Sequence, residues 1–242
     1  MNAYDDFADD YVQMVDQGLA DPHSVQSQAT GTLLTVAGSV NGLDVVDIGC
    51  GEGHLVRRLA PYARQVTGVD LSTRLLQAAQ ARTEASNVSF IHDDAQTLSR
   101  LARQSADLVL CNLALMDMAD LDAVYASVYR VLRPAGHFVF SITHPCFQAP
   151  DSHNEFDVEG RFVARRVIRY AQAEQWQSTY PDGVRGRVGA YHRPLSDYIN
   201  PLIAAGFALS QLVEPVLDSE GRAVETTAAA VIPTLMVISA TR

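Results

Sequence analysis

Lysine is absent from this sequence of 242 residues, so all 18 of its basic residues are arginines. Enzymes that form a Schiff base, anchor pyridoxal phosphate or hold phosphates in a P-loop use a lysine for that chemistry, and these classes are excluded. Basic residues are also outnumbered by acidic ones, which leaves a net charge of −10 and no run rich in arginine. A nucleic acid would be repelled, and we expect a small-molecule partner instead.

Cysteines and long apolar runs are also scarce. Cys50, Cys111 and Cys146 are odd in number and show no paired spacing, so the sequence predicts neither a disulfide framework nor a metal site. No apolar stretch approaches the roughly 18 residues that a membrane helix needs. The N-terminal segment is acidic where a signal peptide would be basic, and we expect a cytoplasmic protein without a membrane partner. A homodimer remains one alternative for its oligomeric state.

Short β-rich runs alternate with amphipathic stretches along most of the chain. We expect strands at 43–48, 65–69, 88–91, 107–111, 137–142, 207–214 and 235–240, and helices at 55–62, 73–84, 121–132 and 195–205. This alternation predicts a parallel sheet with helices on both faces. The length and the 48% apolar content suit one α/β domain.

A glycine-rich loop follows the first expected strand. Gly49, Gly51 and Gly53 stand at every second position, and Asp47 precedes them. Glycine permits positive φ angles and lets a ligand lie against the main chain. The dinucleotide fingerprint fails because His54 replaces its last glycine. Asp70 ends the next strand, where its carboxylate can accept two hydrogen bonds from a ribose, so these motifs predict a ribose without a pyrophosphate.

These motifs resemble the class I S-adenosylmethionine-dependent methyltransferases, and within them the small-molecule branch around the ubiquinone, menaquinone and biotin-pathway enzymes. The resemblance is strong over residues 40–145 and weak elsewhere. It implies S-adenosyl-L-methionine as the cofactor. It also implies a Rossmann-like, seven-stranded, mostly parallel sheet with an antiparallel last strand, helices on both faces and a cap insertion.

The resemblance also assigns residues to the cofactor. Segment 90–95 looks like the region that meets the adenine, and segment 107–113 like the strand end that holds the methionine part. Asp93 stands where the family usually has glycine, so Asp93 and Asp94 compete for the adenine contact, and we favour Asp94. The implied cofactor-binding residues are Asp47, Gly49, Cys50, Gly51, Gly53, Asp70, Leu71, Asp94, Ala95, Asn112 and Leu113.

The family resemblance divides the chain into a helical leader at 1–40, a cofactor-binding core at 41–145, a substrate cap at 146–194 and a C-terminal helix and hairpin at 195–242. Aromatic residues and arginines are concentrated in the cap, where they could hold a flat or anionic substrate by stacking and bidentate hydrogen bonds. The alternative is that residues 161–170 form a half-exposed strand with solvated arginines. Trp176 and Tyr191 are the candidate substrate contacts in the cap.

Two further candidate substrate contacts lie outside the cap. Tyr4, Phe7 and Tyr11 recur at helical spacing, and the resemblance implies a leader that folds over the cofactor, with Tyr11 at the methionine end of the cofactor or at the acceptor. The alternative is a hydrophobic stripe that docks a surface helix. Asp117 stands where the family often has histidine and could bind an amine acceptor, or could simply face solvent.

Methyl transfer asks few side chains to take part, because the enzyme mainly aligns the acceptor and excludes water. A hydroxyl or carbon-acid acceptor would need a general base, and His144 and His192 are the candidates because both should border the acceptor pocket. For each, the alternative is a loop histidine that binds a backbone carbonyl or caps a helix.

Together these features predict an enzyme that transfers methyl from S-adenosylmethionine to O, N or C of a small-molecule metabolite. Two alternatives stay open. One is a nucleotide-dependent oxidoreductase, and the other is a non-catalytic S-adenosylmethionine-binding protein without an acceptor pocket.

Overall fold

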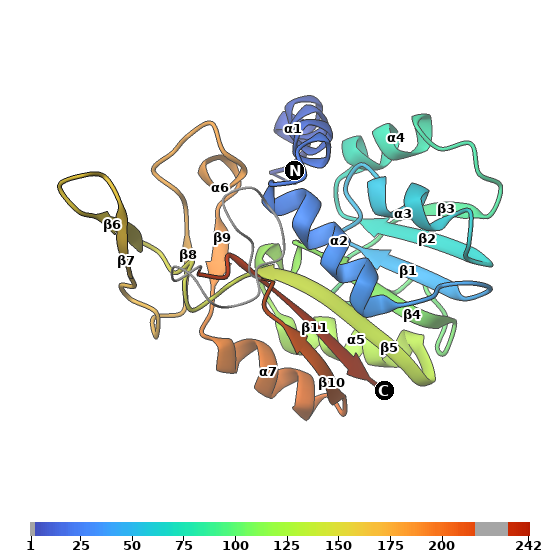
Figure 1. Cartoon of the computed structure of the whole chain (residues 1–242). Helices are drawn as coiled ribbons and strands as arrows, with labels where there is room; N and C mark the ends of the chain where they lie inside the picture. The colour runs from blue at the N-terminus through green and yellow to red at the C-terminus, as the bar shows by residue number, and fades with distance from the viewer. Residues whose placement is uncertain (1–2, 216–231) are drawn as a thin grey trace.

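A seven-stranded sheet forms the centre of the molecule in the computed structural model, which describes residues 3–215 and 232–242 (Figure 1). Its strands, in spatial order, are β10 (Ala208–Val213), β11 (Leu235–Thr241), β5 (Leu132–Thr143), β4 (Ala106–Asn112), β1 (Asp44–Ile48), β2 (Gln65–Asp70) and β3 (Val88–His92). Strands β5, β4, β1, β2 and β3 pair in parallel, whereas β11 lies antiparallel to both β5 and β10. The predicted mostly parallel sheet with an antiparallel last strand is confirmed.

The strand order reverses next to β1. The chain runs outward from β1 to β2 and β3, then returns to place β4 on the other side of β1. In open parallel sheets, ligands bind outside the carboxyl ends of the strands at such a reversal. The fold therefore places the site at the end of the sheet where Ile48, Asp70, His92 and Asn112 terminate their strands.

Helices cover both faces of the sheet (Figure 1). They are α1 (Ala8–Ala20), α2 (Val25–Ala37), α3 (His54–Leu59), α4 (Thr73–Ala81), α5 (Leu121–Val131) and α7 (Leu195–Ala204), with short 3-10 turns η1 (Asp5–Phe7) and η2 (Leu115–Asp117). One buried cluster packs side chains of α2 and α3 against the sheet, and another packs those of α5 and α7. Ser72 caps α4 as its side chain accepts the Leu75 N–H at 3.1 Å.

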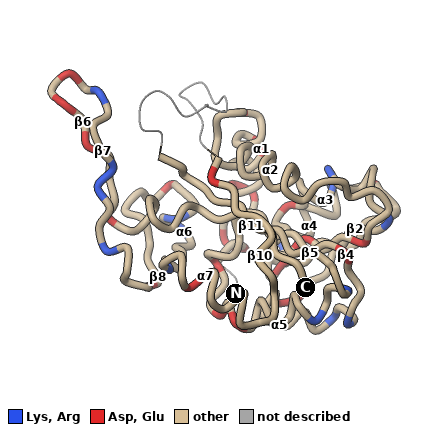
Figure 2. The backbone as a smooth tube through the Cα atoms, turned by 60° about the horizontal axis from the view of Figure 1, so that its bottom comes forward, with Lys and Arg blue, Asp and Glu red and all other residues tan. Residues whose placement is uncertain are grey.

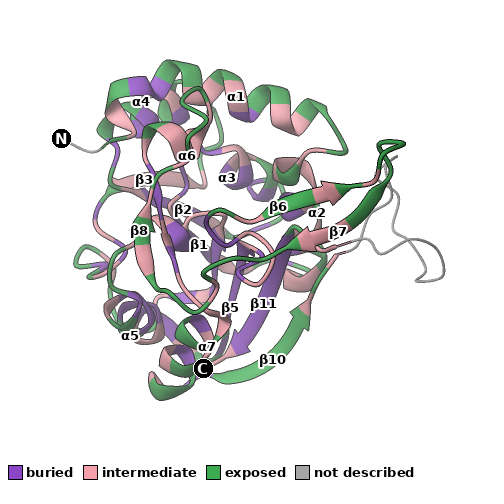
Figure 3. Ribbon diagram, turned by 90° about the vertical axis from the view of Figure 1, so that its left-hand side faces the viewer, coloured by how far each residue is buried: buried purple, intermediate pink, exposed green. Residues whose placement is uncertain are grey.

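Segment 146–194 stands apart from this sheet. It forms a hairpin of β6 (His153–Phe156) and β7 (Phe162–Arg166), a second antiparallel pair of β8 (Glu174–Trp176) and β9 (Ala190–His192), and the short helix α6 (Val184–Arg187). The β6–β7 hairpin projects from the body and is mostly exposed, whereas β1, β5 and β11 are largely buried (Figure 3). The exposed Arg166 of β7 pairs with Glu155 of the hairpin, as the solvated-strand alternative expects, whereas the partly buried Arg165 donates to the carbonyl of Phe147 and to Asn154.

Candidate functional site

A cavity of about 300 Å³ lies at the carboxyl ends of β1 to β4; we call it the cofactor cavity. It is lined by Tyr4, Tyr11, Gly49, Gly51, Val69, Asp70, Leu71, Leu75, Asp93, Asp94, Ala95, Gln96, Asn112, Leu113, Ala114, Asp117, Met118 and Ala119. Most of the predicted cofactor residues meet in this wall, whereas Asp47, Cys50 and Gly53 do not line it. The predicted acceptor contacts Tyr11 and Asp117 line it as well.

The glycine loop needs glycine for two different reasons. Gly49, Gly51 and Gly53 all have positive φ, at 67°, 54° and 81°. At Gly49 a Cβ would also come within 2.5 Å of the Cβ of Ala114, so the loop could not pack against the segment after β4. At Gly51 a Cβ would meet the Tyr11 ring only at 3.5 Å, so its conformation, and not lack of space, requires glycine.

Asp70 is held in the cavity wall by the main chain. Its Oδ2 accepts the N–H of Gly51 at 2.8 Å, and its Oδ1 accepts the N–H of Ser72 at 2.8 Å. Burial raises the pKa of Asp70, and these N–H bonds act against that rise. Each carboxylate oxygen can accept a second hydrogen bond. The carboxylate is therefore fixed in place and still able to accept two hydroxyl groups.

The two acids after β3 differ in how far their oxygens are used. Asp93 accepts the N–H of Asp94 and the hydroxyl of Ser99 on Oδ1, at 2.9 and 3.1 Å, and the N–H of Arg100 on Oδ2 at 2.8 Å. Asp94 accepts one bond on each oxygen, both from Gln96. Asp93 thus closes the turn, and Asp94 keeps more acceptor capacity toward the cavity, which supports the preference for Asp94 at the adenine.

Backbone strain marks the end of β4. Leu113 has a φ of 55°, which is rare for a residue with a branched side chain. Its N–H is held by the hydroxyl and carbonyl oxygens of Ser141, at 2.9 and 3.1 Å. The same hydroxyl donates to Oδ1 of Asn112 at 2.6 Å, and Asn112 Nδ2 donates to Thr30 at 3.0 Å. Strain of this kind is typical of ligand sites, where surrounding bonds maintain it.

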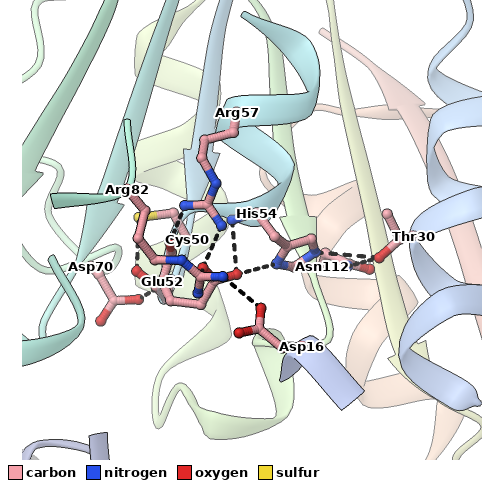
Figure 4. A network of polar contacts seen from close by, with 10 residues as sticks. Asp16, Thr30, Cys50, Glu52, His54, Arg57, Asp70, Arg82 and Asn112 are labelled. Carbon is pink, nitrogen blue, oxygen red and sulfur yellow. Dashed lines mark hydrogen bonds and ion pairs between the residues drawn. The ribbon is translucent and has the colours of Figure 1, made fainter. Parts of the chain in front are cut away.

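A buried charge network supports the glycine loop from behind (Figure 4). Glu52 is completely buried and pairs with Arg57 and with Arg82, whose guanidinium also binds Asp16 of α1 at 2.7 Å. Burial would raise the pKa of Glu52, but hydrogen bonds from His54 and Arg57 outweigh it and hold the value at about 2. Sequence analysis missed Glu52. The available signal was an acid between two loop glycines with an arginine five residues later.

Asp47 lies at the end of β1, immediately before the loop. It is 2% exposed, and its Oδ1 is buried without a hydrogen-bond partner among the described residues. Burial, together with the nearby charges of Asp70 and Glu52, raises the pKa of Asp47 well above its usual range. A buried acceptor without a partner is commonly satisfied by a ligand or by water. Asp47 therefore fits a ligand that brings N–H or O–H donors to the loop.

The leader closes over the cofactor cavity. The hydroxyl of Tyr4 donates to Oδ2 of Asp117 at 2.8 Å, and Arg185 of α6 pairs with the other oxygen of that carboxylate. The rings of Tyr4 and Tyr11 pack edge to face with centroids 5.2 Å apart, and Phe7 lies beside both. Phe7 is buried, as the docking interpretation expects, and Tyr11 lines the cofactor cavity.

A second cavity, of about 130 Å³, lies between the cap and the end of β5; we call it the cap cavity. It is lined by Met116, Thr143, Pro145, Gln148, Trp176, Arg185, Ala190, Tyr191, His192, Arg193 and Tyr198. Trp176, Tyr191 and His192 are therefore brought together here and not in the cofactor cavity. His192 Nε2 lies 2.8 Å from the carbonyl oxygen of Tyr170, so this nitrogen carries the proton.

His144 lines neither of these cavities. It is 2% exposed, its Nδ1 accepts the N–H of Cys146 at 3.2 Å, and its Nε2 lies 2.6 Å from Glu214. The expectation that His144 borders the acceptor pocket is not met, because both ring nitrogens are turned to protein groups at the ends of β5 and β10. This geometry matches the alternative of a structural loop histidine.

In the described part of the chain, no group of three or more His, Cys, Asp or Glu side chains is arranged to hold a metal ion. Over those same residues, no helix has the length and apolar character needed to cross a membrane.

Comparisons with known proteins converge on one family. A family model described as a methyltransferase domain matches residues 46–140, which contain the glycine loop, Asp70, Asp94 and Asn112. The ubiquinone biosynthesis O-methyltransferase of Serratia proteamaculans is 24% identical over 185 residues, covering 73% of this chain and 77% of that protein. The malonyl-[acyl-carrier protein] O-methyltransferase of Pseudescherichia vulneris is 32% identical over 150 residues, covering 61% and 58%. The crystal structure of an S-adenosylmethionine-dependent methyltransferase from Mesorhizobium loti is 29% identical, with a TM-score of 0.74 and coverage of 88% and 96%.

Proposed function

This chain is an S-adenosylmethionine-dependent methyltransferase, and on that premise we propose that it methylates a small-molecule acceptor that binds between the cofactor cavity and the cap. The observation that carries the proposal is the pairing of the two cavities. One lies at the strand ends, the other lies under the cap, and the η2 turn contributes Asp117 to the first and Met116 to the second. An acceptor in the cap cavity would thus lie next to the cofactor.

The residues of the larger cavity fit the cofactor. We propose that Asp70 binds the ribose hydroxyls, that Asp94 and the backbone of Ala95 meet the adenine, and that Asn112 and Leu113 hold the methionine part. The support is geometric: Asp70 and Asp94 keep acceptor capacity, and the glycine loop lets a ligand lie against its main chain. Asp47, with one buried oxygen lacking a partner, fits an N–H donor at the loop.

S-adenosylmethionine, when bound, supplies a methyl group on an already activated sulfonium, so the protein's main tasks are alignment and exclusion of water. Tyr4 and Tyr11 serve the second task, since both cover the cavity. Burial raises the pKa of each phenol well above its usual value, so both hydroxyls stay protonated and act as hydrogen-bond donors. Should the acceptor require a base, His192 is the histidine of the cap cavity, and its Nδ1 would accept the proton.

We propose further that the acceptor is not a nucleic acid and that the protein works in the cytoplasm. Acidic and basic positions are interspersed along the described backbone (Figure 2). A net charge of −10 disfavours association with a polyanion.

Calorimetric titration of the protein with S-adenosylmethionine, S-adenosylhomocysteine and NAD in parallel tests the cofactor assignment. We expect micromolar affinity for the first two and no binding of NAD. Transfer of a radiolabelled methyl group to a panel of small hydroxy acids, amines and thiols then tests the acceptor class. Label that enters only tRNA or protein would contradict a small-molecule acceptor.

A further inference from the structure

Two arginines of the cap are fixed to the wall that separates the cavities. Arg185 pairs with Asp117, which lines the cofactor cavity, and donates to the carbonyl of Gly189 at 3.0 Å. Arg193 Nη2 donates to the carbonyls of Met118 and Ala119 at 2.6 and 2.7 Å, and both of these residues also line the cofactor cavity. Both arginines therefore line the cap cavity and at the same time bind residues that line the cofactor cavity.

The charge of the cap cavity is one-sided. Its lining includes Arg185 and Arg193 but neither Asp nor Glu. Nη1 of Arg193 is buried and makes no hydrogen bond of full geometry among the described residues, while the guanidinium interacts with the side chain of Tyr198. Arg193 also borders an open groove that contains Asp120, Asp122 and Asp197. A buried donor on a cationic group is costly unless an acceptor satisfies it, so this site is suited to an anion.

Aromatic side chains make up much of the remaining wall, beside the polar Thr143 and Gln148. The Arg193 guanidinium lies 4.9 Å from the centroid of the Tyr191 ring and 6.0 Å from that of Tyr198, and Trp176 packs beside the same core. Aromatic faces of this kind favour planar groups. The volume of about 130 Å³ admits a small acid or the acidic end of a larger molecule.

We infer that the cap cavity binds the carboxylate of the methyl acceptor, a small planar acid, through Arg185 and Arg193. Asp117 then acts as an internal competitor: without acceptor it pairs with Arg185, and an incoming carboxylate takes its place. This inference rests on the proposed function and names the substrate class. It also opposes the earlier alternative in which Asp117 binds an amine acceptor, because the two assign opposite roles to Asp117.

Calorimetry on the full chain saturated with S-adenosylhomocysteine tests the inference, with benzoate, benzamide and benzylamine as probes. We expect benzoate to bind at least about tenfold more tightly than its neutral and cationic analogues, the usual size of a charge-assisted contact. Arg185→Gln should weaken benzoate by about tenfold or more, whereas Asp117→Asn should strengthen it by removing the competing carboxylate. A purely structural ion pair predicts weaker binding in both variants.

Arg187→Gln is the matched control. Arg187 lies on the same helix, pairs with Asp10 of the leader at 2.8 Å and lies over Phe7, but it lines neither cavity. Its loss should leave benzoate affinity unchanged. If Arg185→Gln does not fold, Arg185→Lys keeps the charge without the planar fork and should weaken benzoate more than benzamide.

The outcomes separate the two claims. No binding of S-adenosylhomocysteine to the wild-type protein would overturn the proposed function and the inference with it. Normal binding of S-adenosylhomocysteine, with benzylamine preferred over benzoate or with an equal loss in Arg187→Gln, would overturn the inference alone.

Discussion

The carboxylates around the cofactor cavity differ in role because they accept different donors. The oxygens of Asp93 accept hydrogen bonds from the turn after β3. Those of Asp94 and Asp70 can each accept a further bond from a ligand in the cavity. Asp47 has a buried oxygen with no partner in the described chain, and Glu52 is saturated by arginines. All five side chains are carboxylates, so residue type alone does not predict their different roles. The hydrogen-bond donors around each carboxylate decide its role.

Replacing Asp70 by Ala should weaken S-adenosylmethionine binding by about 2–6 kcal/mol, since two hydrogen bonds to the ribose, each worth roughly 1–3 kcal/mol, are lost. Titration calorimetry measures the change. Asp120→Ala is the control, because Asp120 also accepts a backbone N–H, that of Ala123, but does not line the cofactor cavity. Equal affinity in wild type and Asp70→Ala would contradict the ribose contact.

Substitutions of His144 and His192 should affect different properties, the first stability and the second methyl transfer. His144→Gln removes the contact with the half-exposed Glu214 and should lower the free energy of unfolding by about 1 kcal/mol, with methyl transfer retained. His192→Gln should lower kcat by about 100-fold if the acceptor needs a base, with cofactor affinity unchanged. Urea unfolding and turnover on the same samples give both values. Full turnover in His192→Gln would remove the general-base proposal.

At the scale of elements, the glycine loop is stabilised by helices that come before it in sequence. Arg82 of the segment after α4 joins Glu52 of the loop to Asp16 of α1. Thr30 of α2 lies 3.4 Å from His54 of α3 and accepts from Asn112 at the end of β4 (Figure 4). The loop conformation therefore depends on α1 and α2 as well as on the sheet.

Lowering the pH should weaken the ion pairs by which Glu52 stabilises the glycine loop. Glu52 has a pKa of about 2 in the folded protein against 4.5 ordinarily, so its contribution is present above pH 4.5 and is lost as the pH falls toward 2. The contribution is of the order of 3 kcal/mol. Glu52→Gln should be less stable at neutral pH and lose less stability than the wild type over that window. Urea unfolding at several pH values gives both curves, and parallel curves would contradict the assigned ion pairs.

Most element positions were predictable, and the exceptions have tertiary causes. Strand 65–69 and helix 121–132 were expected within one residue of β2 and α5 because buried and exposed positions alternate locally. The fifth strand was expected at 137–142 but begins at Leu132, ahead of Pro134 and Gly136. Ala135 and Gly136 exchange backbone hydrogen bonds with Arg242, a partner more than 100 residues away, which extends the strand.

At the scale of the whole molecule, the site is assembled from opposite ends of the chain. The leader brings Tyr4 and Tyr11, η2 brings Asp117, and the cap brings Arg185, and these residues meet above the strand ends. Arg187 of the cap also binds Asp10 of α1 directly. The leader, which lines the cavity with Tyr4 and Tyr11, is thus joined to segment 146–194 beside the cavity.

This contact between the leader and segment 146–194 predicts that binding of S-adenosylhomocysteine protects both from hydrogen exchange. Saturating S-adenosylhomocysteine, at about 100 times its Kd, should raise the free energy of unfolding by roughly 2.7 kcal/mol. Hydrogen exchange should slow in residues 4–20 and 184–189, since both segments rest on the cavity wall. The exposed edge strand β10 is the internal control and should be unaffected. Protection confined to the glycine loop would contradict this coupling of the two segments.

The sequence by itself determined the strand–helix alternation, the cofactor class and most residues of the cofactor cavity. It could do so because periodicity, glycine spacing and strand ends are local, and parallel strands bring their carboxyl ends to one edge. Only the tertiary structure decided that His144 faces Glu214, that Glu52 is a buried anchor and that Arg185 pairs with Asp117 between two cavities. These arrangements depend on which distant side chains burial brings together, and only the pairing of Glu52 with Arg57 has a local signal in the sequence.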